Sequence, residues 1–206
     1  AEAARRAGAR LHPHTTVGIE LAGDGWRVVG PGAEDGAPPD LVLVAAGAWT
    51  PRVPGLPAAL APPVRPVAGQ ILALRMPADA PLLRHVVVAP DVYLVPRRDG
   101  RLVVGATSEE RGYEAPLTAG GVRALLDGVC RVLPAAAPLP IDELWSGLRP
   151  GSPGGVPSLG WLAPGLAVAA GHHRNGILLT PVTADAMAAL LLGEPVPAWL
   201  ADFAPG

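Results

Sequence analysis

The chain has 206 residues, of which 50% are hydrophobic and 17% charged, with a formal net charge of −2 at pH 7. This balance argues against nucleic-acid binding, which needs a basic surface, and against intrinsic disorder, which needs low hydrophobicity. The single cysteine, Cys130, excludes an internal disulfide and fits an intracellular, cytoplasmic protein.

The N-terminal part predicts a short helix, a hairpin and a buried strand. Residues 1–7 are expected to be helical, and because the chain opens within this helix we expect it to be a piece of something longer. Strands are expected at residues 11–17 and 26–29, around the turn Gly23-Asp24-Gly25. The apolar run at 41–47 is typical of a strand buried on both faces, and the Pro-rich stretch at 51–66 indicates a domain crossing.

From Val67 the pattern changes to short strands separated by turn signals. The expected strands are residues 69–76, 86–88, 93–96 and 102–107, which together predict an antiparallel meander. Residues 118–133 form the clearest amphipathic helix, with apolar positions three and four apart and Pro134 after its end. A further strand is expected at 141–148, followed by a Gly/Pro loop at 150–164.

Residues 166–192 carry the most informative pattern of the chain. A strand at 166–170 leads through GHHRNGILLTP (171–181) into a helix of about 176–192. Unpaired N–H groups and the dipole at a helix start favour negative charge, so this layout predicts an anion or cofactor site. The helix is apolar nearly all round, and we expect it to be buried in the core. We find no apolar stretch of roughly 18 residues and therefore expect no membrane span.

Other sequence motifs give little support for chemistry. The segment GPGAEDG (30–36) is the nearest approach to a dinucleotide fingerprint, but its last glycine is one position too far and Pro38-Pro39 follow it. The histidine pairs at 12/14 and 172/173 lack helical spacing and a supporting Cys or carboxylate cluster, so no metal site is predicted. Ser158 has no nucleophile-elbow context, and Cys130 is expected to be inert packing.

Six segments in register over nearly the whole chain resemble the FAD-dependent D-amino-acid oxidase family, most closely its glycine oxidase branch linked to thiamine biosynthesis. They are LVLVAAGAWTP (41–51), PVAGQ (66–70), YLVPR (93–97), LVVGAT (102–107), WSGLRPG (145–151) and GHHRNGILLTP (171–181). The match covers the family's C-terminal part. The family's N-terminal Gly-rich flavin-binding unit has no counterpart in these residues.

The resemblance implies an α/β FAD-binding domain of glutathione-reductase-like type, incomplete here and interrupted by an α+β substrate domain with an antiparallel sheet. Residues 1–55 and 146–206 would belong to the FAD-binding domain, and residues 56–145 to the substrate domain. The implied cofactor is FAD, the substrate a small amino acid and the electron acceptor dioxygen. A homo-oligomer is left open.

The resemblance also implies roles for individual residues. Arg149, Arg174 and Tyr93 would bind the substrate, and no catalytic side chain is assigned because the flavin carries the chemistry. The implied cofactor-binding residues are Val17, Gly47, His172, His173, Arg174, Asn175, Gly176, Ile177 and Leu178.

Two of these residues have alternative interpretations. Arg149 could form a surface ion pair with Asp142 or Glu143, and Tyr93 could be an ordinary half-buried strand tyrosine. Asp91 stands where the glycine oxidase pattern has a histidine two positions before the tyrosine. An acidic group there would favour an amine and disfavour a second carboxylate.

The implied reaction is oxidative deamination, with hydride transfer from the substrate Cα to flavin N5. Its products would be an imine or 2-oxo acid, ammonia and hydrogen peroxide. The alternatives are a sarcosine oxidase or D-amino-acid dehydrogenase of the same fold, or a non-catalytic fragment that cannot hold FAD alone. Because the phosphate loop is missing, we expect this chain by itself to be inactive.

Overall fold

The computed structural model describes residues 1–23, 25–31, 39–77 and 79–206, which form two compact units. The first unit comprises Ala1–Val64 and Pro150–Gly206, and the second comprises Arg65–Arg149. Among the described residues, the first unit has two sheets and two hydrophobic clusters, the second has one of each, and each unit has one long helix. The assignment of these segments to a FAD-binding and a substrate domain stays a prediction.

The first unit begins with helix α1 (Glu2–Arg6) and an antiparallel hairpin of β1 (Gly18–Ala22) and β2 (Gly25–Val29). The hairpin is confirmed, but its first strand lies at 18–22 instead of 11–17. Pro13 cannot donate to a strand ladder and His14 has a φ of 58°, whereas Ile19 is buried in the core opposite Val28. Asp24 of the predicted turn and residues 32–38, which include most of the GPGAEDG segment, lie outside the described residues.

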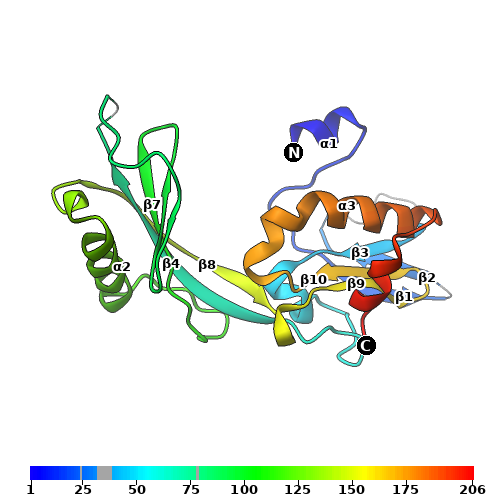
Figure 1. Cartoon of the computed structure of the whole chain (residues 1–206). Helices are drawn as coiled ribbons and strands as arrows, with labels where there is room; N and C mark the ends of the chain where they lie inside the picture. Colours follow the sequence, from blue (N-terminus) through cyan, green and yellow to red (C-terminus); the bar gives the residue numbers. More distant parts are fainter. Residues whose placement is uncertain (24, 32–38, 78) are drawn as a thin grey trace. The chain divides into compact units, whose positions relative to one another are not determined.

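A three-stranded sheet in the order β3-β10-β9 forms the centre of this unit (Figure 1). β10 (Leu166–Ala170) runs parallel to β3 (Val42–Val44) and antiparallel to β9 (Ser158–Ala163). β9 lies inside the stretch expected to be a Gly/Pro loop, and its Leu159 is buried. β10 is the strand buried on both faces. The same prediction for β3 is wrong, because Leu43 is 38% exposed on the outer strand of the described sheet.

Helix α3 (Gly176–Leu192) has the predicted bounds and lies along β9 and β10 (Figure 1). The expectation of a helix buried in the core is wrong. Within the described residues only Ala186 and Met187 of α3 are buried, whereas Ile177 is 93% and Leu178 79% exposed. α3 packs on the sheet through one side only. Most of its other apolar side chains are exposed, although the helix is apolar on every side.

Two 3₁₀ helices flank this region, η4 (His173–Asn175) before α3 and η5 (Ala198–Phe203) after it. The continuous helical stretch 173–192 is long and apolar enough, by length and composition alone, to cross a membrane. The expectation that no apolar stretch of this length exists is therefore wrong, whereas the expectation that nothing spans a membrane stays a prediction. Arg174 and Asp185 interrupt the apolar run without removing its overall apolar character.

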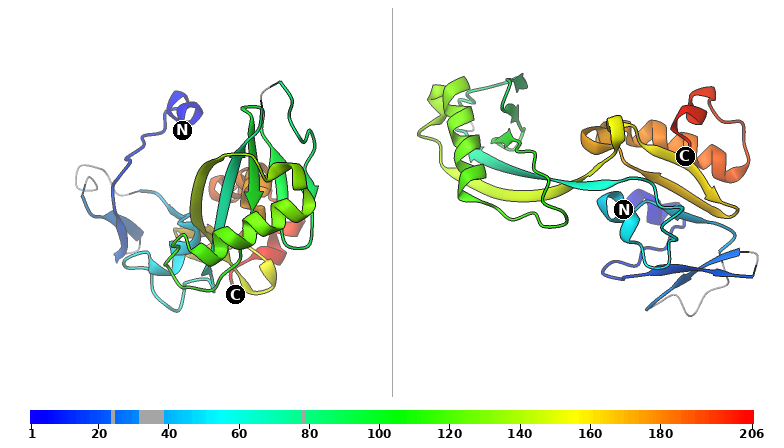
Figure 2. Two further views of the ribbon diagram at one scale, coloured as in Figure 1. Left: turned by 90° about the vertical axis from the view of Figure 1, so that its left-hand side faces the viewer. Right: turned by 90° about the horizontal axis from the view of Figure 1, so that it is seen from below.

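The second unit is a five-stranded sheet in the order β5-β6-β7-β4-β8, with helix α2 (Ala119–Val132) against one face (Figure 2). The strands are β4 (Arg65–Arg75), β5 (Val87–Val88), β6 (Tyr93–Pro96), β7 (Arg101–Gly105) and β8 (Ile141–Gly151). β5, β6 and β7 form an antiparallel meander as predicted. β4 is also antiparallel but pairs with β7 instead of β5, so its predicted place in the meander is wrong. The short η1 (Gly47–Arg52), η2 (Pro134–Ala136) and η3 (Pro153–Gly155) complete the elements.

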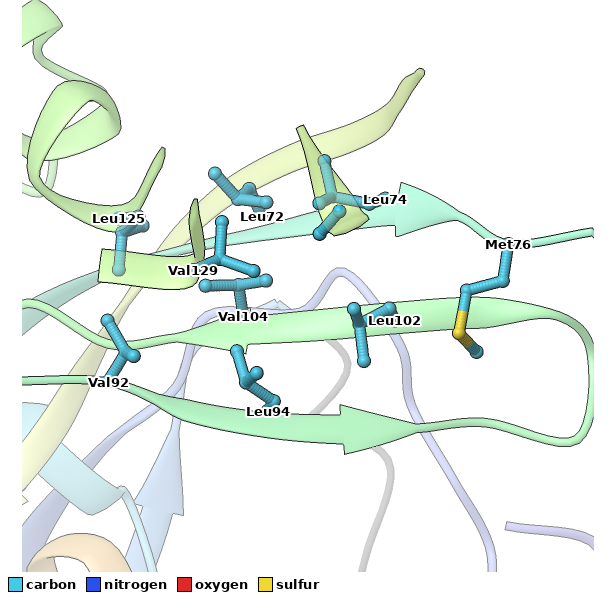
Figure 3. Packing of buried hydrophobic residues seen from close by; sticks show 10 residues of the cluster. Leu72, Leu74, Met76, Val92, Leu94, Leu102, Val104, Leu125 and Val129 are labelled. Atoms are coloured by element: carbon cyan, nitrogen blue, oxygen red, sulfur yellow. The ribbon is translucent and has the colours of Figure 1, made fainter. Parts of the chain in front are cut away.

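The core of the second unit lies between α2 and one face of the sheet (Figure 3). Alternate residues of the central strands point to this face, because successive side chains of a strand point to opposite sides. α2 supplies residues spaced four apart, and Thr118 caps its start by accepting from the Gly121 N–H at 3.1 Å. The buried residues that meet here include Leu72, Leu74, Leu94, Leu102, Val104, Leu125 and Val129. The opposite face of the sheet is turned away from α2.

Candidate functional site

Arg149 lies near the end of β8, and its guanidinium occupies the space above Gly69 of β4. Its Nη1 donates to the carbonyl oxygens of Ala68 at 3.4 Å and Thr107 at 3.2 Å. A Cβ on Gly69 would overlap Nη1, Nη2 and Cζ of the guanidinium. Both of these acceptors are neutral carbonyls, so the two hydrogen bonds orient the fork without neutralising its charge.

The alternative ion-pair partners of Arg149 contact other arginines. Asp142 lies 2.6 Å from Arg75, and Glu143 lies 3.1 Å from Arg101. The surface ion pair and the substrate role of Arg149 both stay predictions, and the two hydrogen bonds given above go to backbone carbonyls.

Tyr93 lies over a second glycine of the same sheet. It is the cross-strand partner of Gly105, which also pairs with Ile71 of β4. A Cβ on Gly105 would overlap the Tyr93 ring and its hydroxyl. Directly opposed residues of antiparallel strands share a face, as do Gly69 and Ile71 two positions apart. The Tyr93 ring and the Arg149 guanidinium therefore lie on the same face, opposite the one that α2 covers.

These two glycines are site residues that the sequence analysis missed. Gly69 lies in the PVAGQ segment and Gly105 in LVVGAT, both inside predicted strands. A glycine weakens the interior of a strand, and it often marks a place where another group approaches the backbone closely. The occurrence of a glycine inside each of these two predicted strands was therefore the signal that could have identified Gly69 and Gly105.

Asp91 contacts the helix of this unit. Its carboxylate lies 2.6 Å from the Arg131 guanidinium of α2, and both side chains are well exposed. α2 covers the face opposite Tyr93. The predicted influence of Asp91 on the choice of substrate gains no support from this ion pair and stays a prediction.

In the first unit, two strand ends meet at one edge of the sheet. β3 and β10 are parallel, with Val44 opposite Val168, so the chain leaves both strands on the same side. Gly47 follows β3 with a φ of 56° and Gly171 follows β10 with a φ of 86°, a region that glycine adopts without strain. The carbonyl of Gly171 accepts from the buried Ser152 hydroxyl at 2.7 Å. The predicted cofactor residues Gly47 and 172–178 are thus brought to a common edge, where ligands of α/β sheets bind.

The N-terminus of α3 lies at this edge and suits an anion. Asn175 makes no side-chain capping hydrogen bond, and the first turn of the helix contains no acidic residue. Arg174 and His173 precede it, and the 17-residue helix directs its positive dipole end toward them. The donors at this terminus are therefore backbone N–H groups backed by one guanidinium.

His172 contributes hydrogen bonding to this turn and little charge. Its Nε2 lies 3.1 Å from the Thr183 hydroxyl of α3. Burial lowers the pKa of the His172 imidazole, which favours the neutral ring at pH 7. Arg174 supplies a positive side-chain charge in the same turn.

The remaining predicted residues are placed as follows. Val17 precedes β1, and its Cα lies 3.3 Å from the position that a Cβ on Gly30 would take. Its contact with the cofactor stays a prediction, and so does the role of Arg174 beside Arg149, because these two arginines belong to different units. Cys130 is partly buried against the core of the second unit. In the part of the chain that the structure describes, no three His, Cys, Asp or Glu side chains are grouped to hold a metal ion.

Comparison with known proteins gives a consistent family. The profile of the DAO family, FAD dependent oxidoreductase, matches residues 1–190. The bifunctional protein ThiO/ThiG of Synechocystis sp. is 42% identical over 170 residues, which are 81% of this chain and 25% of that protein. Glycine oxidase of Pseudomonas aeruginosa is 38% identical over 190 residues, which are 90% of this chain and 51% of that protein.

The solved structures agree with the sequence relatives. The crystal structure of glycine oxidase from Geobacillus kaustophilus matches with a TM-score of 0.90 at 36% identity, over 99% of this chain and 55% of that one. The chain thus spans about half the length of the glycine oxidases and about a quarter of the bifunctional protein.

Proposed function

Because the chain belongs to the FAD dependent oxidoreductase family, we propose that the protein containing it is a flavin-dependent oxidase of small amino acids, of the glycine oxidase type. The reaction converts an amino acid, dioxygen and water into a 2-oxo acid, ammonia and hydrogen peroxide. The observation that carries the proposal is the shared face of Arg149 and Tyr93, each lying over a strand glycine. A guanidinium fork grips a carboxylate through two hydrogen bonds, and a phenol hydroxyl orients the carboxylate or the amine.

The residues of this chain bind and orient the substrate. Arg149, with Tyr93, holds the carboxylate and thereby fixes the direction of the substrate Cα–H. The part of Arg174 in substrate binding stays a prediction of the family resemblance. FAD, when bound, supplies the two-electron oxidation. Proton transfer by a side chain is not needed when the substrate amine arrives neutral, which agrees with the assignment of no catalytic acid or base.

The sheet edge of the first unit fits FAD by the chemistry of its donors. We propose that Gly47 and residues 172–178 hold the flavin side, with Val17 at the adenine half. Backbone N–H groups at the uncapped start of α3, together with Arg174, would stabilise negative charge on the flavin when it is bound. The exposed apolar face of α3 supports a FAD-binding domain completed by residues outside this chain, so the chain alone would not retain FAD.

The test uses the full-length protein that contains this chain. We expect oxygen consumption and hydrogen peroxide release with glycine, and Arg149→Met should lower kcat/KM about a hundredfold, the loss expected for two hydrogen bonds to a charged group. Arg123→Met is the matched control, because Arg123 is an exposed α2 residue paired with Asp127.

The same assay separates the alternatives. Faster turnover of sarcosine than of glycine would indicate a sarcosine oxidase. Turnover of D-alanine with an artificial dye but not with dioxygen would indicate a dehydrogenase. The absence of turnover with any small amine would overturn the proposal. The isolated 206 residues should purify colourless, and a yellow preparation would contradict the proposed incomplete FAD site.

A further inference from the structure

Four polar side chains of the second unit form a hydrogen-bonded group beside Arg149, and we call Gln70, Thr107, Glu109 and Thr118 the Gln70 cluster. Gln70 is 1% exposed. Its Nε2 donates to Glu109 Oε1 at 2.7 Å and to Thr118 Oγ1 at 3.0 Å, and its Oε1 accepts from the Thr118 N–H at 2.8 Å. The amide of Gln70 is therefore satisfied on both donors and on its acceptor, which holds it in a single orientation.

Thr107 joins this cluster to the substrate arginine. Its hydroxyl accepts from the Gln70 N–H at 2.9 Å and donates to Glu109 Oε1 at 2.8 Å. Its backbone N–H donates to the Gln70 carbonyl at 3.2 Å. Its own carbonyl is one of the two acceptors of Arg149 Nη1. One residue thus connects the buried Gln70 to the guanidinium.

Glu109 also fixes the second acceptor of Arg149, which is the carbonyl of Ala68. Ala68 and Glu109 exchange two backbone hydrogen bonds, with N···O distances of 2.8 and 2.9 Å. The Ala68 carbonyl that accepts from Glu109 also accepts from Arg149 Nη1. Both carbonyls that orient the guanidinium therefore belong to residues bonded directly to Glu109 or Gln70.

The Glu109 carboxylate is the point where the cluster converges. It accepts from Thr107 and Gln70 on one oxygen and lies 2.7 Å from Arg111 on the other. The hydrogen bonds from Thr107 and then Gln70 lower the pKa of this carboxyl, so it is ionised at pH 7. The regular pairing of β4 with β7 ends at Gly105, and the segment that follows is joined to β4 mainly through this cluster.

We propose that the Gln70 cluster positions the Arg149 guanidinium for the substrate carboxylate, with Thr107 as the contacting residue and Glu109 as its anchor. This inference rests on the proposed function, in which Arg149 holds that carboxylate. The cluster acts through Arg149 and does not touch the substrate. Its loss should therefore weaken carboxylate binding with little effect on the chemical step.

The experiment compares Thr107→Val with Thr107→Ser in the full-length protein. Valine keeps the shape of threonine and loses the hydroxyl, whereas serine keeps the hydroxyl. We expect Thr107→Val to raise the KM for glycine, and the Kd for glycolate as a carboxylate probe, about tenfold, with kcat within about twofold. Thr107→Ser should restore both constants. Glu109→Gln serves as a second variant if Thr107→Val does not fold, and Glu110→Gln, an exposed neighbour paired with Arg65, is its matched control.

Arg149→Met separates this inference from the proposed function. Wild-type glycolate affinity in Arg149→Met would overturn the assignment of Arg149 itself. If Arg149→Met loses glycolate binding while Thr107→Val and Glu109→Gln keep it, the cluster has only a structural role and the inference is overturned. In the Arg149→Met background, Thr107→Val should cause no further loss of kcat/KM, because the two residues act through one contact. An additive loss would contradict the inference.

Discussion

The Arg149 guanidinium occupies the space that a Cβ on Gly69 would fill, so this placement of Arg149 requires glycine at position 69. Replacing Gly69 by alanine must displace the guanidinium, because the backbone of β4 is held on both sides. We expect Gly69→Ala in the full-length protein to raise the KM for the amino acid about tenfold to a hundredfold, the usual cost of a misplacement of about 1 Å. Steady-state kinetics and glycolate titration measure it.

Gly147→Ala is the matched control for this prediction. Gly147 lies on β8, the strand that carries Arg149, and a Cβ there would meet no atom within 4 Å. Its substitution should leave the KM unchanged. Equal effects of the two alanines would show that β8 tolerates changes poorly in general, and would contradict a specific fit between Gly69 and Arg149.

Tyr93 has a testable role of the same kind. Tyr93→Phe removes only the hydroxyl, and loss of one hydrogen bond to a charged substrate group should lower kcat/KM about tenfold to a hundredfold. Gly105→Ala should act in the same direction, because a Cβ there overlaps the Tyr93 ring. If Tyr93→Phe turns over glycine like the wild type, Tyr93 is a half-buried strand tyrosine and Gly105 serves packing alone.

The local sequence pattern was enough to predict most of the helices and strands. The α2 helix could be predicted because its apolar residues recur every three or four positions between Thr118 and Pro134, and both ends carry their own signals. The meander could be predicted because turn residues separate short β-rich runs. The family could be identified because its segments keep their order along the chain.

Features that depend on distant partners could not be predicted in this way. The position of Arg149 above Gly69 depends on the register between β8 and β4, which no local pattern encodes. The same holds for the Gln70 cluster, whose members come from three separate segments of the chain. The exposure of α3 was missed for the opposite reason. Composition records that its residues are apolar but not which part of the protein covers them.

The pH dependence of stability should contain a contribution from His172. Burial lowers the pKa of this imidazole from 6.5 in the folded state, so the unfolded chain binds a proton more readily. Stability should fall as the pH drops from about 6.5 through the folded pKa, and it should not change for this reason above about 7.5. Denaturant unfolding of the full-length protein between pH 5 and 8, with His172→Gln as the comparison, measures the difference.

One variant controls this prediction. His172→Gln should have a flatter stability profile below about pH 6.5, because glutamine does not titrate there. The same slope in the wild type and in His172→Gln would mean that the pKa of His172 is equal in the folded and unfolded states.

The exposed apolar face of α3 makes a prediction about the rest of the protein. Leu192, which is not among the proposed cofactor-binding residues, is 73% exposed in this chain, and Val88 on β5 is 79% exposed. If the FAD-binding domain is completed over α3, Leu192→Ser should lower the free energy of unfolding of the full-length protein by about 1.5–3 kcal/mol, the value of burying such a side chain. Val88→Ser should cost less than about 0.5 kcal/mol, as surface substitutions do. Urea unfolding at saturating FAD measures both. Equal small effects would mean that α3 keeps this face in solvent in the full-length protein, so the completion of the FAD-binding domain would have to be sought on another surface.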